Sequence, residues 1–141
     1  MRKLVLLGVA VLSLALVGGA VGTADAKKKK PKPATLSLTL TPNHLKVGTK
    51  YTAELKGYSG RFSKLGVDGH SSPCASTKKA ENQTHGIYTN VVGKKTNYDW
   101  KIKFTASAVG TRHVCAYLYD PSNEGDPHQR HKSATYTATA R

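Results

Sequence analysis

The sequence predicts an all-β fold, an antiparallel β-sandwich of about seven strands with one disulfide. Short segments alternate apolar and polar residues with the period of two that is typical of half-buried strands. Turn-forming residues separate these segments at near-even spacing. No segment keeps a helical apolar period over three turns, which disfavours long helices. A small closed barrel is the alternative architecture.

The alternation places each strand along the chain. The predicted strands cover residues 35–41, 50–56, 62–67, 87–92, 98–104, 112–119 and 133–140. The clearest is 98–104, where Trp100 shares an apolar face with Ile102 and Phe104. This position predicts core packing for Trp100 rather than stacking on a sugar. Residues 68–82 are rich in turn formers and predict a loop, with one helical turn over 75–81.

The first 26 residues have the composition of an export signal. Arg2 and Lys3 precede an apolar run over residues 4–17, and small residues end in Ala24-Asp25-Ala26. This order is typical of a secretory signal peptide and predicts cleavage after Ala26. An uncleaved membrane anchor is the alternative, but the lysines after the run outnumber the charges before it and would hold the body in the cytoplasm. We therefore expect a secreted or cell-envelope protein, and the exit motif suits a bacterial signal peptidase.

Positive charge dominates the rest of the chain. The sequence has 22 Lys and Arg against 8 Asp and Glu, a formal net charge of +14. Residues 27–33 form a Lys/Pro-rich tail that we expect to be disordered, and residues 34–141 are long enough for one sandwich domain. The tail predicts a weak site for an anionic polymer, and a solubilising spacer is the alternative. The site would consist of Lys27, Lys28, Lys29, Lys30 and Lys32.

The chain has two cysteines, Cys74 and Cys115. In an exported protein this number predicts one disulfide between them. Two buried free thiols are the alternative. Two cysteines are too few for a structural zinc site, which needs four ligands, so we expect no metal and no cofactor.

Framework segments around these cysteines resemble those of a known family of domains. Residues 47–52, Val-Gly-Thr-Lys-Tyr-Thr, lead into the second predicted strand, and residues 110–118 carry Cys115. With Cys74-Ala75 and Glu81 between them, they resemble the small secreted immunoglobulin-like or fibronectin-like domains of actinobacteria. The resemblance covers most of residues 34–140 and implies a sandwich with one cystine and a mostly unassigned function.

The chain departs from antibody domains in two places. Trp100 lies in a late strand rather than soon after the first cysteine. His113 occupies the position two residues before the second cysteine, where antibody domains have a tyrosine. Cys74 falls in a predicted loop. We therefore expect the bridge to join that loop to the penultimate strand.

Two loop features resemble metal sites. Residues 120–126 carry Asp120, Ser122 and Glu124 at the first, third and fifth positions of a calcium loop, but the twelfth position is His131 rather than glutamate. A plain strand connection is the better interpretation. His128 and His131 lie three residues apart, but no third ligand is visible by spacing, which predicts exposed loop histidines.

Catalysis has little support in the sequence. Cleavage of RNA needs an acid–base pair and a cation, and any basic exported chain supplies these types. The candidates here are Glu54, Glu81, His85, Arg112 and His113. The Gly-x-Ser-x-Gly motif of hydrolases is missing. Tyr58 and Tyr88 lie beside turns and could stack on sugars.

These observations predict an exported, non-catalytic binding or structural module of the cell envelope or extracellular space. The expected partner is an anionic envelope polymer or a surface protein, and nucleic acid is disfavoured. The alternatives are a small secreted hydrolase or nuclease, and a protein-interaction domain that uses its loops or a sheet edge.

Overall fold

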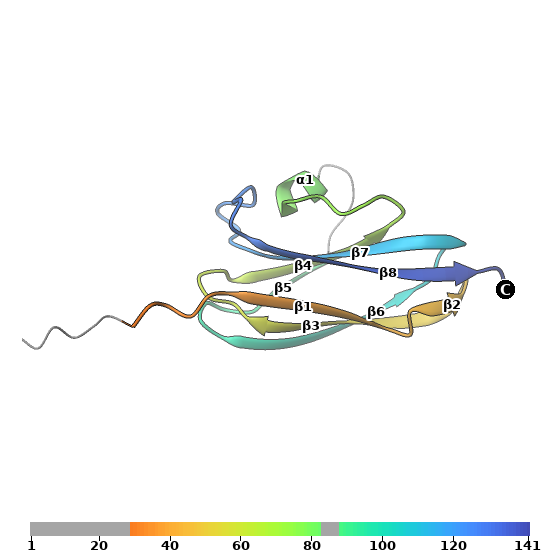
Figure 1. The fold of residues 1–141 in the computed structure, drawn as a ribbon, viewed down its shortest axis with the longest axis horizontal. Coiled ribbons are helices and arrows are strands. Elements are labelled where there is room, and N and C mark those ends of the chain that lie inside the picture. The colour runs from red at the N-terminus through yellow and green to blue at the C-terminus, as the bar shows by residue number, and fades with distance from the viewer. Residues whose placement is uncertain (1–28, 83–87) are drawn as a thin grey trace, which may run out of the picture.

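The computed structural model describes residues 29–82 and 88–141, and these form two packed β-sheets (Figure 1). The smaller sheet has the strand order β1-β3-β6, and the larger one has the order β2-β8-β7-β4-β5. The strands are β1 (Thr35–Thr41), β2 (His44–Lys46), β3 (Lys50–Tyr58), β4 (Lys64–His70), β5 (Tyr88–Val91), β6 (Asn97–Thr105), β7 (Gly110–Tyr119) and β8 (Arg130–Thr139), and the single described helix is α1 (Lys78–Asn82). The predicted all-β sandwich is confirmed. The predicted leader, residues 1–26, lies outside the described residues.

Two elements differ from the predicted ones. Strand β2 was not predicted, because only Leu45 of its three residues is buried and such a short segment shows no alternation. It pairs in parallel with β8. Strand β4 continues through Asp68 and Gly69 to His70, where a loop was predicted. Pairing with β7 holds this segment extended as far as the His70 and His113 pair, so tertiary pairing overrides the turn-forming composition.

The core lies between the two sheets and follows the predicted alternation. Leu55 of the central strand β3 is fully buried and pairs with Leu38 on one side and Trp100 on the other. Trp100 is half-buried and packs against the core, as predicted. Burial of one leucine contributes about 1.5–3 kcal/mol. The other sheet contributes buried Leu65, Val67, Val114, Ala116, Leu118, Tyr136 and Ala138.

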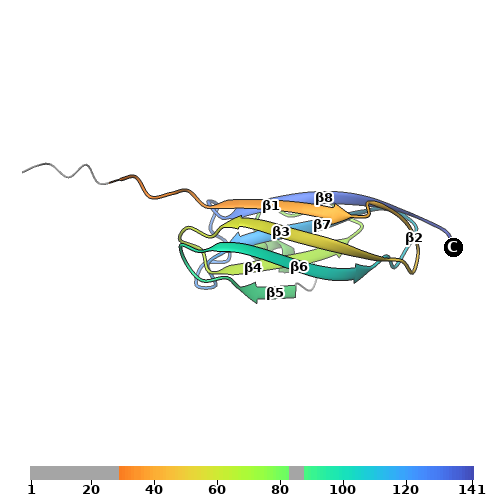
Figure 2. The same ribbon diagram turned by 90° about the horizontal axis from the view of Figure 1, so that it is seen from below.

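The two sides of the sandwich close differently. Strand β1 runs along the same side as β8, and β5 and β6 share the opposite side (Figure 2). There Tyr88 of β5 packs edge-on against Phe104 of β6, with ring centroids 5.6 Å apart. All four residues of β5 are exposed, and Tyr88 keeps 63% of its surface in solvent. Strand β5 is thus an open sheet edge.

Strand β7 is buried on both of its faces. Cys115, Tyr117 and Tyr119 point away from the core between the sheets, yet each is at most 1% exposed. Residues 71–82, which we call the cover segment, include α1 and lie outside the larger sheet (Figure 1). Within the described residues, no helix is long and apolar enough to cross a membrane.

The backbone of β1 passes very close to Gly57 of β3. A Cβ at this position would lie 2.1 Å from the carbonyl oxygen of Thr35. We therefore expect Gly57→Ala to push β1 outward and to lower the free energy of unfolding by about 1–3 kcal/mol, measured by urea denaturation. Gly125→Ala is the control, because a Cβ there meets nothing closer than 3.5 Å. Equal effects of the two substitutions would show that the close approach of β1 to Gly57 does not limit the side chain at this position.

Candidate functional site

The described part of the tail leaves the sandwich at the end opposite to the C-terminus (Figure 1). Lys29, Lys30 and Lys32 are exposed there, whereas Lys27 and Lys28 lie outside the described residues. Two cations make contacts at the junction of the tail and the domain. The ammonium of Lys32 lies 4.4 Å from the centroid of the Tyr58 ring, and Nε of Arg130 donates a hydrogen bond to the Ala34 carbonyl. The first contact holds the tail beside the domain, and the second holds Ala34, the residue at which the tail joins the domain.

Two shallow hollows of about 370 and 400 Å³ flank the tail. We call the cations that line them the basic end, and these are Lys29, Lys32, Arg61, Lys95 and Arg130. Within the described residues, Arg61 alone among these five has a carboxylate at ion-pair distance. The other four charges are uncompensated by any described acid. The structure therefore joins tail lysines to cations of the β3–β4 turn, the β5–β6 turn and the start of β8.

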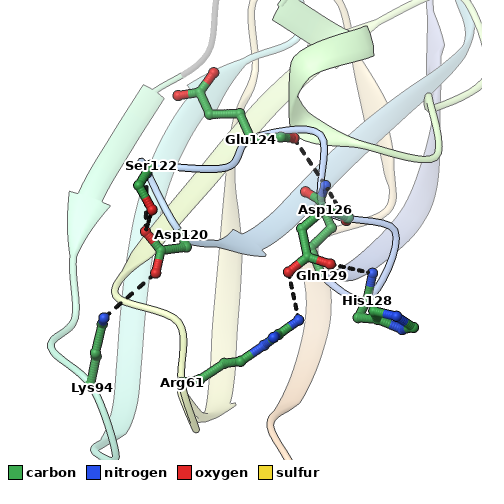
Figure 3. A network of polar contacts seen from close by, with 8 residues as sticks. All are labelled: Arg61, Lys94, Asp120, Ser122, Glu124, Asp126, His128 and Gln129. Atoms are coloured by element: carbon green, nitrogen blue, oxygen red, sulfur yellow. Dashed lines mark hydrogen bonds and ion pairs between the residues drawn. The ribbon is translucent and has the colours of Figure 1, made fainter.

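The acidic loop beside the basic end does not gather its carboxylates. Asp126 pairs with Arg61 at 2.5 Å, and Asp120 lies 3.5 Å from Lys94 (Figure 3). Glu124 pairs with Lys78 of α1 at 2.7 Å. Each carboxylate thus neutralises a cation from a different element.

Local hydrogen bonds account for the rest of this loop. The backbone and hydroxyl of Ser122 both donate to Asp120 and hold the pKa of that carboxyl below its usual range. The backbone N–H of His128 donates to Asp126 at 2.8 Å (Figure 3). Asp and Ser side chains commonly form such hydrogen bonds in turns that connect two strands. The geometry is that of the predicted strand connection.

A second cluster lies buried between the cover segment and the larger sheet. Cys74 of the cover segment is bonded to Cys115 of β7, so the predicted disulfide and its loop-to-strand placement are confirmed. Glu81 of α1 is 1% exposed and pairs with His70 at the end of β4. Nε2 of His70 lies 3.3 Å from the sulfur of Cys115.

Hydrogen bonds keep the Glu81 side chain in this position. Its Oε2 accepts the backbone N–H of Ala75 at 2.8 Å and lies 2.8 Å from the Tyr117 hydroxyl. Burial opposes ionisation of Glu81, but the hydrogen bonds that it accepts outweigh burial and lower its pKa. Burial and the adjacent Glu81 carboxylate raise the pKa of Tyr117, which stays a protonated donor.

Within the described residues, the acid–base residues of the nuclease hypothesis do not come together in one site. Glu54 is on the outer face of the smaller sheet with Lys56 and Lys101, whereas Glu81 is behind the larger sheet. The two carboxylates of the nuclease hypothesis therefore lie on opposite sides of the sandwich. Arg112 and His113 are half-buried on β7, and His85 lies outside the described residues.

The remaining loop side chains are also separate. His128 lines one of the hollows at the basic end, and His131 stacks on Tyr117 with centroids 6.4 Å apart. Tyr58 is covered by Lys32, and Tyr88 packs on Phe104.

His70 had no signal in the sequence analysis. Its strand is interrupted by Gly66 and Gly69, so no alternation assigns it to a face. A histidine four residues before a cysteine was the one available hint. Glu81 was considered only as a framework residue of the resemblance and as an acid–base type, because sequence alone did not show that α1 places it against His70.

Together the fold and these surfaces define a disulfide-bonded β-sandwich module with one basic end. No protein-family model matches the sequence, and a search of curated proteins gives no match. Among solved structures, the chain is similar to the CARDB domain of the PF1109 protein from Pyrococcus furiosus, described in complex with di-metal ions. The match covers 77% of this chain and 96% of that chain, with 13% identity and a TM-score of 0.45. Similarity at this level carries no functional argument.

The bridge closes a loop between residues 41 positions apart. We expect the Cys74→Ala/Cys115→Ala double variant to lose about 4 kcal/mol of unfolding free energy in the chain-entropy model. Urea denaturation in the presence of a chelator measures this loss. A variant as stable as the parent chain would show that hydrogen bonds alone hold the cover segment.

The paired carboxylates of the acidic loop predict that calcium has no effect. Since Asp120, Glu124 and Asp126 each hold a different cation, millimolar calcium should leave the melting temperature unchanged by scanning calorimetry. A ligand that binds only the folded state would raise it. A rise with calcium that magnesium does not reproduce would overturn this interpretation.

Proposed function

We propose that this chain is an exported, non-catalytic binding module that is attracted to an anionic polymer of the cell envelope through its tail and basic end. The observation that carries the proposal is the convergence of the tail with Lys95 and Arg130 at one end of the sandwich. Four of the five cations there have no described acid as a partner. The expected occupant carries phosphate or carboxylate groups along a flexible backbone.

The chemistry of these cations suits phosphate groups. Arginine presents five donors in a planar fork that matches phosphate oxygens, and the Arg130–Ala34 hydrogen bond is formed by Nε. A lysine near an anionic surface contributes up to about 1 kcal/mol, and salt screens this attraction. The hollows are shallow, so they fit a chain that crosses the surface better than a small enclosed ligand. Affinity would come from several weak contacts.

The test is co-sedimentation of the full chain with purified bacterial cell wall across a salt series. The protein is produced in an exporting bacterial host, where the mass of the product also shows whether cleavage follows Ala26. We expect the protein to pellet at low salt and to be released at high salt. The variant with Lys29, Lys30 and Lys32 changed to Gln should bind more weakly, by up to about a hundredfold.

A matched variant separates this site from net charge alone. Lys46, Lys50 and Lys103 are also exposed, but they lie near the other end of the sandwich. Changing these three to Gln removes the same charge and should leave most of the binding intact. Equal loss in both variants would contradict a localised site. If the parent chain does not pellet at all, the tail is a spacer, and the β5 edge becomes the candidate surface for a protein partner.

A further inference from the structure

Four groups that commonly bind metals meet in the buried cluster behind the larger sheet. His70, Glu81 and Cys115 each place one ligand atom within 4.8 Å of the other two. Cys74 joins them because its sulfur is bonded to that of Cys115. The set therefore contains two sulfurs, one imidazole nitrogen and one carboxylate oxygen.

One separation in this set already matches the spacing of ligands around a tetrahedral ion. Zinc binds thiolate at about 2.3 Å and imidazole or carboxylate at about 2.0–2.2 Å, which sets neighbouring ligand atoms about 3.3–3.8 Å apart. The 3.3 Å between Cys115 sulfur and Nε2 of His70 falls at this spacing. The two sulfurs are bonded to each other, and Nε2 of His70 is in direct contact with Oε1 of Glu81. Both pairs would have to separate to admit the ion. Cys74 lies in an irregular, partly exposed segment, so it is the partner able to move.

The surroundings orient the carboxylate. Oε2 of Glu81 is held by the Ala75 N–H and lies beside the Tyr117 hydroxyl, whereas Oε1 faces His70. Outer contacts of this kind fix a ligand's orientation in metal sites. A disulfide is uncharged and needs no such neighbours. Burying a carboxylate and an imidazole beside it costs desolvation free energy.

We propose that Cys74, Cys115, His70 and Glu81 form a zinc site when the disulfide is reduced. A dithiol reductant supplies two electrons and two protons in two exchange steps. Its thiolate first attacks the sulfur of Cys74, the more exposed residue of the pair. Cys115 then leaves as a thiolate beside His70. Its second thiol then releases Cys74 as a thiol, and the reductant becomes a disulfide. Cys115 takes back from solvent the proton that the attacking thiol lost, so that both cysteines are thiols. Zinc binding then displaces these two protons to solvent.

The cover segment would therefore be attached to the sheet in two alternative ways, by the disulfide or by the metal ion. In the oxidised chain the covalent bridge ties Cys74 to β7. In the reduced chain one ion would join β4, β7, α1 and Cys74 through its four ligands. The inference does not depend on the tail or on the proposed polymer binding.

The test compares metal binding by the oxidised and the phosphine-reduced full chain. Cobalt is the probe, because tetrahedral thiolate coordination has intense visible and charge-transfer absorption, and zinc affinity is measured by competition with a chromophoric chelator. We expect one metal per reduced chain and none at this site in the oxidised chain. Zinc should also raise the melting temperature of the reduced chain, but not that of the oxidised chain.

Single substitutions identify the ligands. His70→Ala and Glu81→Gln should each weaken zinc binding more than about tenfold. His131→Ala is the control, because His131 stacks on Tyr117 but lies outside the ligand set. Circular dichroism shows whether the reduced chain is folded.

Three results would overturn the proposal. One is a reduced chain that binds cobalt no better than the oxidised chain. Another is an octahedral spectrum, or an affinity unchanged in His70→Ala, since both indicate coordination elsewhere. The third is a reduced chain that is unfolded and stays unfolded when zinc is added.

Discussion

The burial of strand β7 on both faces is the constraint on which the rest of this structure depends. One face packs into the core between the sheets. The side chains on the other face, Cys115, Tyr117 and Tyr119, are buried from solvent. The cover segment that shields them has one short helix and no apolar core of its own. It is therefore tied down by specific bonds, the disulfide and the hydrogen bonds of Glu81, rather than by area alone.

The buried cluster and the basic end occupy different parts of the molecule. The larger sheet and its cover enclose His70 and Glu81, and both side chains are almost fully shielded from solvent. The basic end presents exposed lysine side chains around shallow hollows. Polymer attraction and metal binding would consequently be independent properties, since the first is set by exposed charge and the second by covalent state. Loops positioned by a rigid scaffold commonly carry recognition in this way.

Much of the fold could be predicted because alternation is a local property. The strands around Leu55, Trp100 and Val114 each show an apolar face that must be buried, and their pairing follows. Strand β2 escaped prediction because three residues carry no period. The acidic loop looked like one cluster, yet Asp120 and Asp126 turn to cations that are distant in sequence. Spacing along the chain does not show the direction of a side chain in a loop.

By itself, the sequence determined the all-β class, the positions of most strands, the excess of positive charge and the pairing of its two cysteines. Each of these follows from local periodicity, composition or counting. Only the tertiary structure decided that His70 and Glu81 lie beside the bridge and that the tail shares one end with Arg61 and Arg130. These neighbours come from segments up to about a hundred residues apart, and no local pattern encodes contacts that depend on how two sheets are stacked.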